Sequence, residues 1–296
     1  MSRRFFLVAI LAGAVAMGAC AQAFTVSYLD GTVELQSAKG WTEISIGDKV
    51  PQDAMVRISL TGSLELLRAR TKITILKDGV YSIATLTAAA GTGASGGVGS
   101  TIAQKLQTLV TEKPRANTAG GVRAAEQGTN SVTWVEENES DDTRTQVQAL
   151  LDKDRYTEAA SLLNDAIKAS GSDADSAELN YLLGLAYYRA GQTARAYRTL
   201  ARTTPKPDAA WYARYVILKA QVLVDGQSYS DALAILTPFI SAYPTGEATQ
   251  VAYLLSGLSQ KGLGDKAAAK AALDSGFQLD PKSETAKLID QQRSAL

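Results

Sequence analysis

The chain has 296 residues, with 30 basic and 30 acidic side chains. That length is enough for two domains with cores of their own, and the balanced charge does not indicate a nucleic-acid partner or an acidic substrate. The sequence has no histidine and one cysteine, Cys20, which excludes histidine-based catalysis, a histidine or thiolate metal site and an intramolecular disulfide. We therefore expect a protein without enzymatic activity, cofactor or bound metal.

The first residues are typical of an export signal. The basic "SRR" precedes the apolar "FFLVAILAGAVAMGA", which is short for a membrane span, so residues 1–23 are predicted to be a signal peptide. Two processing routes are open. The small-x-small "AQA" places cleavage after Ala23, whereas "MGAC" resembles a bacterial lipobox and would leave a lipidated Cys20. Either route predicts an exported protein of the periplasm or cell envelope.

Residues 24–88 have the alternation of short strands. Apolar residues occupy every second position in "GTVELQ", "AMVRIS", "GSLELL", "KITILK" and "VYSIATL", and turn residues separate these segments. Each such strand has one apolar face to cover. We therefore predict a small antiparallel, sandwich-like or barrel-like β domain.

Two blocks of this region resemble the FecR-type domain. The first is "YLDGTVEL" followed by "GWTEISIGDKVPQDAMVRISLTGSLELL", with Trp41 and the Gly47–Asp48 turn, and the second is "NTAGGVRAAEQGTNSVTW" at 117–134. The resemblance implies a FecR-like domain over 24–135. FecR-type regulators of sigma factors carry a cytosolic part and a membrane span before this domain. Here it follows the signal almost at once, so signal transmission would need another protein.

An insertion separates the two blocks. Residues 87–100, "TAAAGTGASGGVGS", contain G-x-G-x-x-G from Gly91 to Gly96. A dinucleotide site would need a parallel strand before this motif and a helix after it, whereas the strands before it have an antiparallel pattern. We interpret residues 87–100 as a flexible Gly-rich loop and predict a short helix over 101–113.

The acidic run "EENESDD", residues 136–142, is predicted to be a solvated linker between two domains. Helical periodicity and an internal repeat follow over 143–296. Successive alanines are 37, 36 and 37 residues apart, and a leucine follows each by four positions. The repeated residues are Ala159, Ala196, Ala232 and Ala269 with Leu163, Leu200, Leu236 and Leu273.

These repeats resemble tetratricopeptide repeats (TPRs). In the segment "GLAYYRAGQTARAY", Gly184, Tyr187, Gly191 and Ala196 match the family pattern in order. The resemblance implies hairpins of two helices that approach closely at the Gly and Ala positions, with "SETAKLIDQQRSAL" as a C-terminal capping helix. Pro is expected to end the second helices of repeats three and four, at Pro244 and Pro281. The fold class is therefore α+β, multidomain.

The TPR resemblance also implies a concave groove lined by the first helix of each repeat. The groove positions are Glu178, Tyr181, Leu185, Tyr188 and Arg189 in repeat two, Arg214, Ile217, Gln221 and Val224 in repeat three, and Val251, Leu254, Leu258 and Lys261 in repeat four. Tyrosine and arginine are common in protein interfaces. The candidate partner contacts are therefore Tyr181, Tyr188, Arg189, Arg214 and Gln221, while Tyr187 is expected in the core.

Together these features favour a non-enzymatic scaffold or adaptor of the cell envelope, which binds a protein or peptide segment in the groove. Two alternatives stay open. The chain is a sensor component related to FecR-type regulators, or its β domain binds peptidoglycan or another envelope glycan and the repeats position it.

Overall fold

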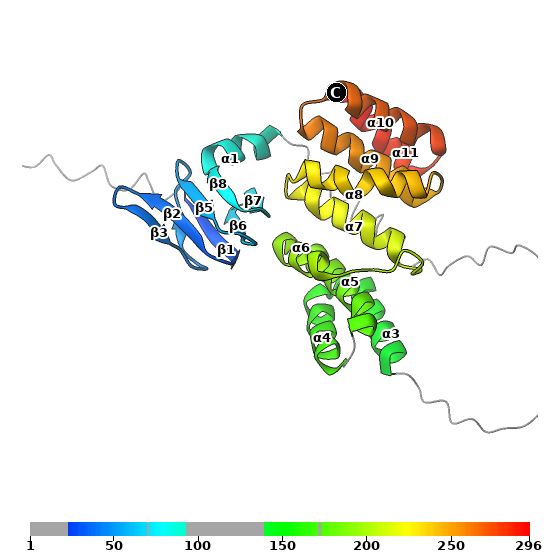
Figure 1. Cartoon of the computed structure of the whole chain (residues 1–296), viewed down its shortest axis with the longest axis horizontal. Coiled ribbons are helices and arrows are strands. Elements are labelled where there is room, and N and C mark those ends of the chain that lie inside the picture. Colours follow the sequence, from blue (N-terminus) through cyan, green and yellow to red (C-terminus); the bar gives the residue numbers. More distant parts are fainter. Residues whose placement is uncertain (1–22, 70, 93–138, 171–172) are drawn as a thin grey trace, which may run out of the picture. The chain divides into compact units, whose positions relative to one another are not determined.

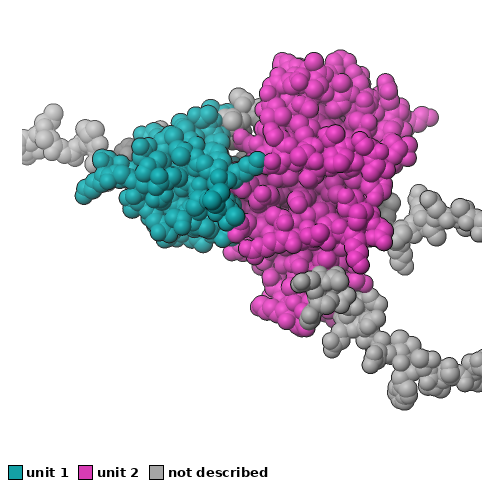
Figure 2. Space-filling model, in the orientation of Figure 1, with its two compact units in different colours: residues 1–73, 77–92 teal, residues 74–76, 93–296 magenta. Residues whose placement is uncertain are grey.

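The computed structural model describes residues 23–69, 71–92, 139–170 and 173–296 (Figure 1). The chain divides into two compact units, residues 1–73 with 77–92 and residues 74–76 with 93–296 (Figure 2). The first consists of antiparallel strands and one helix, and the second is a stack of helices. The predicted fold class, α+β with a C-terminal helical stack, is confirmed.

Among the described residues, eight strands form two four-stranded sheets, in the orders β4-β1-β6-β7 and β3-β2-β5-β8. The pairs β1–β4, β1–β6, β2–β3, β2–β5 and β5–β8 are antiparallel. The strands are β1 (Phe24–Asp30), β2 (Val33–Ser37), β3 (Gly40–Glu43), β4 (Lys49–Val50), β5 (Met55–Ile58), β6 (Ser63–Arg68), β7 (Thr71–Ile75) and β8 (Gly79–Ser82).

The alternation in the sequence corresponds to burial in these strands. Val56 and Ile58 of β5 are buried, while the residues between and before them are partly exposed, because successive side chains point to opposite faces of a sheet. The residues that carry the FecR resemblance shape turns and strand pairs. Gly47 has a φ of +97°, which favours glycine, and the Asp48 carboxylate accepts a hydrogen bond from the Ser45 N–H at 2.7 Å.

The prediction of a strand across "VYSIATL" is wrong in its second half. Strand β8 ends at Ser82, and helix α1 (Ile83–Thr92) follows directly. The Ser82 hydroxyl accepts from the Thr85 N–H, which stabilises a helix start, and alanines with high helix propensity follow. The first residues of the predicted loop 87–100 are therefore helical. The signal peptide, Cys20, residues 93–100, the predicted helix 101–113 and the second FecR-like block lie outside the described residues.

From residue 139 on, the described part of the helical unit forms four hairpins and a final helix. The hairpins are α3 (Glu139–Asp152) with α4 (Tyr156–Ala169), α5 (Asp173–Arg189) with α6 (Thr193–Arg202), α7 (Tyr212–Asp225) with α8 (Tyr229–Ala242), and α9 (Glu247–Gly262) with α10 (Lys266–Leu279); α11 (Glu284–Ser294) follows. Because α3 begins at Glu139, the last residues of the predicted linker 136–142 belong to a helix. Acidic residues are favoured there by the helix dipole.

The repeated residues form the core of the hairpins, as predicted. All four repeated alanines are fully buried, and the four leucines are at most 1% exposed. A Cβ placed on Gly184 would lie 2.7 Å from the Leu200 side chain, and one on Gly257 would lie 2.6 Å from Leu273. Glycine is therefore required where the paired helices approach most closely. Helices α8 and α10 end two residues before Pro244 and Pro281.

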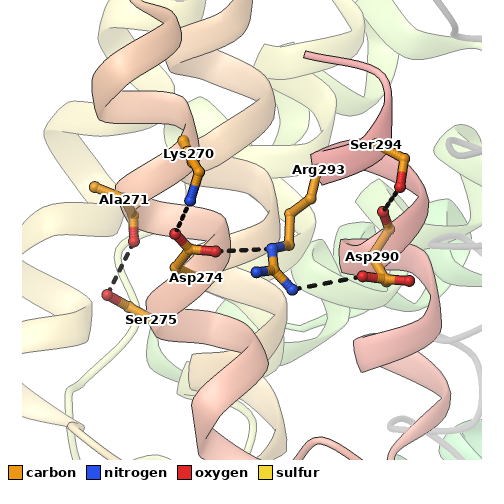
Figure 3. Close-up of polar contacts among 7 residues, drawn as sticks. All are labelled: Lys270, Ala271, Asp274, Ser275, Asp290, Arg293 and Ser294. Carbon is orange, nitrogen blue, oxygen red and sulfur yellow. Dashed lines mark hydrogen bonds and ion pairs between the residues drawn. The ribbon is translucent and has the colours of Figure 1, made fainter.

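The C-terminal helix α11 is held to α9 and α10 by polar contacts. Buried Gln250 donates to the carbonyls of Gly276 (3.1 Å) and Asp280 (2.8 Å) and accepts from the Ser283 hydroxyl at 2.7 Å. On another side, Arg293 of α11 forms an ion pair with Asp274 of α10 at 2.7 Å (Figure 3). Within the described ranges, the helices are all too short or too polar to span a bilayer.

Candidate functional site

The first helices of hairpins two, three and four lie next to one another, since α5 contacts α7 and α7 contacts α9. We call these three helices the first-helix layer. They carry the predicted groove positions, and the five candidate residues all come from α5 and α7. The contacts of those residues show how this layer is built at its polar end.

Tyr181 is almost fully buried, at 1% exposed. Its ring stacks on Trp211, with centroids 5.5 Å apart and planes 13° apart, and Trp211 meets the edge of Tyr215. Burial is the main cause that raises the pKa of Tyr181 far above its ordinary value. Tyr181 therefore anchors the start of α7 against α5 and presents little surface to a ligand.

The Tyr215 hydroxyl lies at the end of α6. It donates to the carbonyl oxygens of Leu200 (2.8 Å) and Thr203 (2.9 Å), which lie at the C-terminus of the helix, where carbonyl groups lack some of their intrahelical partners. It also accepts from the Lys219 ammonium at 3.0 Å. Burial raises the pKa of Tyr215 to about 12. We assign this group a structural role that joins hairpins two and three.

Tyr188, Gln221 and Asp225 form a polar cluster between α5 and α7, which we call the Asp225 cluster. The Tyr188 hydroxyl donates to Oδ2 of Asp225 at 2.8 Å, and Nε2 of Gln221 donates to Oδ1 at 2.8 Å. Tyr188 is 8% exposed and Gln221 is 1% exposed, while Asp225 is partly exposed. Burial, followed by the charge of Asp225, raises the pKa of Tyr188 well above its ordinary value. Tyr188 is therefore a permanent hydrogen-bond donor.

Arg189 faces the first hairpin. Its guanidinium donates to the Tyr156 hydroxyl through Nε (3.2 Å) and Nη2 (2.5 Å), and lies 3.6 Å from the Asp154 carboxylate. The Tyr156 hydroxyl in turn donates to Asp154. The Arg189 side chain is 13% exposed, so its charge is largely engaged by the loop between α3 and α4.

Arg214 is partly exposed in the first turn of α7. It lies close enough to Tyr181 for its charge to oppose the burial effect on the Tyr181 pKa. Glu178, at the start of the same layer, accepts from Arg144 of α3 at 2.9 Å. Charged side chains thus lie both near the starts of α5 and α7, at Glu178 and Arg214, and at their ends, at Arg189 and Asp225.

The structure separates the five candidates into two groups. Arg189 and Arg214 keep some exposed surface, while Tyr181, Tyr188 and Gln221 are interior. We expected Tyr187 in the core and Tyr188 on the groove, and the two exposures are the reverse. Tyr188 is buried and contacts Asp225 of the next hairpin. Tyr187 is partly exposed, and its hydroxyl accepts a hydrogen bond from Asn164 at 3.0 Å. That any of the five contacts a partner stays a prediction.

Sequence reasoning missed Asp225, Trp211 and Tyr156. Asp225 occupies in α7 the repeat position that Arg189 occupies in α5, so continuing the repeat alignment by one residue past Val224 would have found it. Trp211 lies before α7, at a position without a signal in the repeat pattern. Tyr156 begins α4, and a tyrosine recurs at the same repeat position as Tyr229 at the start of α8, a signal that the sequence analysis did not use.

The polar groups of this layer are mostly engaged with one another. Burial raises the pKa values of Tyr181 and Tyr188, and both rings are interior. Across the described part of the chain, we find no group of three or more Cys, Asp or Glu side chains placed to hold a metal ion. The partly exposed charged side chains of the layer are those of Glu178, Arg189, Arg214 and Asp225.

A family model and two solved structures are similar to parts of this chain. The model of anaphase-promoting complex (cyclosome) subunit 3, which has TPR-like repeats, matches residues 152–239. Together with the hairpins, it assigns TPR-like repeats to this chain. The two structures are "MamA RS-1 ArsTM double mutant" and "MamA 41-end from Desulfovibrio magneticus RS-1", at 23% and 22% identity. Each has a TM-score of 0.43 over 49% of this chain and 78% of the other. No curated protein matches the chain.

Proposed function

We propose that this protein is a non-enzymatic adaptor that binds a segment of another protein along its first-helix layer. The observation that carries the proposal is the mutual fixation of the polar side chains there. Arg189 is held by Tyr156 and Asp154, and Asp225 is held by Tyr188 and Gln221. Side chains fixed before binding lose less entropy on contact with a partner. TPR-like repeats, which the hairpins and the family model indicate, suit such a scaffold.

The β unit is proposed to be FecR-like and to dock on a second envelope component. Its support is the FecR resemblance and the position of the motif residues, since Gly47 and Asp48 form a turn and Trp41 lies in β3. The Arg57 guanidinium covers the Trp41 ring at 4.7 Å and is held by Glu34 at 2.6 Å. That ring face is therefore occupied, which favours protein docking over the stacking of a sugar.

The proposed location is the bacterial cell envelope, and its support is the predicted signal peptide. The intact mass of the mature protein tests this step. Cleavage after Ala23 and a diacylated Cys20 give different masses, and an unprocessed chain would contradict export.

The adaptor proposal is tested by crosslinked pull-down from native envelopes with the full chain. The test variant is Arg189→Ala with Arg214→Ala, because these two candidates keep exposed surface. The matched control is Arg155→Ala with Lys168→Ala, which removes the same charge from side chains that are 51% and 78% exposed on hairpin one. Circular dichroism first checks that both variants keep their helicity.

We expect the test variant to lose a partner that the wild type and the control retain. A photo-crosslinker placed at Val224, on the first-helix layer, should label that partner, and one at Ala234, exposed on α8, should not. If the test variant retains every partner, the layer is structural only. Retention of the wild type on envelope glycan beads would favour the glycan-binding alternative instead.

A further inference from the structure

Strand β3 is one edge of its sheet, since it pairs only with β2 among the described strands (Figure 1). In an antiparallel pair, every second residue directs its N–H and C=O groups to the neighbouring strand. The Ile44 N–H donates to the Val33 carbonyl at 2.9 Å, so Trp41 and Glu43, one and three residues before Ile44, direct their backbone groups away from β2. These groups have no hydrogen-bond partner within the described ranges. The edge therefore offers two donors and two acceptors to an added strand.

One row of side chains across this sheet gives the β3 edge a negative charge. Glu43 lies directly opposite Glu34, and Glu34 lies opposite Arg57 of β5. Arg57 is paired with Glu34 at 2.6 Å, whereas the exposed Glu43 carboxylate has no hydrogen bond or ion pair with a described residue. Like charges on directly opposed residues are unfavourable. A cation in the next position of the row, beyond Glu43, would balance the second carboxylate.

The other face of β3 lies at the open side of the apolar interior. Thr42 is exposed and lies opposite Leu35 of β2, which is partly exposed and lies opposite the buried Val56. Successive side chains of a strand point to opposite faces, so an added strand would place every second side chain beside Thr42. An apolar side chain there would remove surface of Leu35 from water, which is favourable.

We propose that β3 accepts an extended segment of a second protein as an added strand, with a lysine or arginine beside Glu43 and apolar side chains at the neighbouring positions. This inference rests on the proposed docking of the β unit and names its surface and the chemistry of the docked segment. Backbone hydrogen bonds to Trp41 and Glu43 supply the pairing. Charged residues on edge strands oppose unselective pairing, so Glu43 restricts the edge to a segment that carries a cation there.

The test uses the full chain labelled with ¹⁵N and followed by NMR. The probes are three peptides, acetyl-Thr-Val-X-Val-Thr-amide, in which X is lysine, glutamine or glutamate. We expect the lysine peptide to slow the solvent exchange of the Trp41 and Glu43 amide protons in a saturable way. The glutamine peptide should bind more weakly and the glutamate peptide most weakly. The Thr42 amide proton already faces β2, so its exchange should change little and serves as an internal control.

Variants of Glu43 separate the charge from the backbone pairing. Glu43→Lys should weaken binding of the lysine peptide about fivefold and strengthen that of the glutamate peptide, because it reverses the cross-strand charge pair. Glu43→Pro removes the outward N–H but no hydrogen bond to β2, and proline is tolerated at such edge positions. It should weaken all three peptides more than Glu43→Gln does, since only the proline removes the donor. Asp53→Asn changes another exposed carboxylate of the same unit and should leave all affinities unchanged.

Three results would each overturn the inference. The first is that the lysine peptide leaves the exchange of the Trp41 and Glu43 amide protons unchanged. The second is that the lysine and glutamate peptides bind equally well, or that Glu43→Lys and Asp53→Asn have equal effects. The third is slow exchange without any peptide that depends on protein concentration, because a second copy of the chain would then occupy the edge. If Glu43→Pro does not fold, the charge reversal in Glu43→Lys decides the question.

The outcome is separable from the docking proposal itself. A photo-crosslinker is placed at Thr42 or, for comparison, at Asp53, and the full chain is crosslinked in native envelopes. Labelling of one component from Thr42 that is lost in Glu43→Lys agrees with the inference. If only the Asp53 position labels a component, the β unit docks through another surface and the inference is wrong. If the lysine peptide pairs with β3 but neither position labels a component, the edge accepts a strand and the docking proposal fails.

Discussion

Repeats two and four are built on the same scaffold but differ in the side chains of their first helices. In both, a glycine of the first helix packs against a leucine of the second, Gly184 against Leu200 and Gly257 against Leu273. The groove positions differ. In α5 they are tyrosine, arginine and glutamate with one leucine, whereas in α9 they are Val251, Leu254, Leu258 and Lys261. The hairpin is therefore repeated within the chain, while the side chains at these first-helix positions, most of them buried, change from polar to apolar.

The polar residues of the fourth repeat serve the end of the stack. Gln250 uses both its NH₂ group and its oxygen to join α9 to α10 and α11, whereas Gln221 leaves its oxygen unpaired. The buried glutamine of repeat four thus uses its whole amide group, whereas that of repeat three uses only its NH₂ group. We therefore expect repeats two and four to respond alike to changes in the shared scaffold, and Gln250 and Gln221 to respond differently to substitution.

Substitutions in the shared hairpin scaffold should have the largest effect on the free energy of unfolding. Leu200→Ala and Leu273→Ala each remove a buried side chain from a close helix pair, and each should lower the free energy of unfolding by about 2–5 kcal/mol. Urea denaturation followed by circular dichroism measures both. Similar costs would show that the two hairpins are equivalent. A cost below about 1 kcal/mol for one of them would mean that its hairpin packs differently from its partner.

Substitution of the two glutamines should lower the free energy of unfolding by different amounts. Gln250→Met leaves two carbonyls and the Ser283 hydroxyl without their partner and should cost about 1–3 kcal/mol. Gln221→Met removes one hydrogen bond to a partly exposed carboxylate, together with an unpaired oxygen, and should cost less than about 1 kcal/mol. The same denaturation experiment compares them. Equal costs would show that the one hydrogen bond from Gln221 to Asp225 stabilises the fold as much as the three hydrogen bonds of Gln250.

These differences indicate which features can be predicted from sequence. The close helix pairs were predictable, since Gly184 and Leu200 recur at a fixed spacing and small residues are needed where helices touch. The position of Tyr188 was not, because neighbouring helical positions differ by about 100° and a contact with Asp225 on the next hairpin decides which side is buried. The end of β8 was not predicted, because the alternation of "VYSIATL" continues across Ser82. In the structure the Ser82 hydroxyl accepts from the Thr85 N–H and so stabilises the start of helix α1.

Loss of the ion pair between Asp274 of α10 and Arg293 of α11 should have a smaller effect on stability (Figure 3). The hydrogen bond from Lys270, together with the charge of Arg293, lowers the pKa of Asp274 from its ordinary value of 3.8. A carboxyl group with a lower pKa in the folded state contributes stability above its unfolded pKa and loses it as the pH falls through the folded value. Asp274→Asn should therefore lower the melting temperature slightly at pH 7, and the difference should shrink as the pH falls below 3.8 and through the lowered pKa of Asp274.

The salt dependence separates this contribution from packing. Arg293 also covers the Phe277 ring at 5.0 Å, so Arg293→Ala removes an aromatic contact as well as a charge. In 1 M NaCl the effect of Asp274→Asn should shrink, because exposed charges are screened, whereas part of the effect of Arg293→Ala should persist. Lys287→Ala, which removes an exposed ion pair within α11, is the matched control and should change little. Asp274→Asn could instead lower the melting temperature as much at pH 3 as at pH 7. That result would show that Asp274 holds α11 through packing. The fourth repeat would then be closed by Gln250 and apolar contacts, without a contribution from charge.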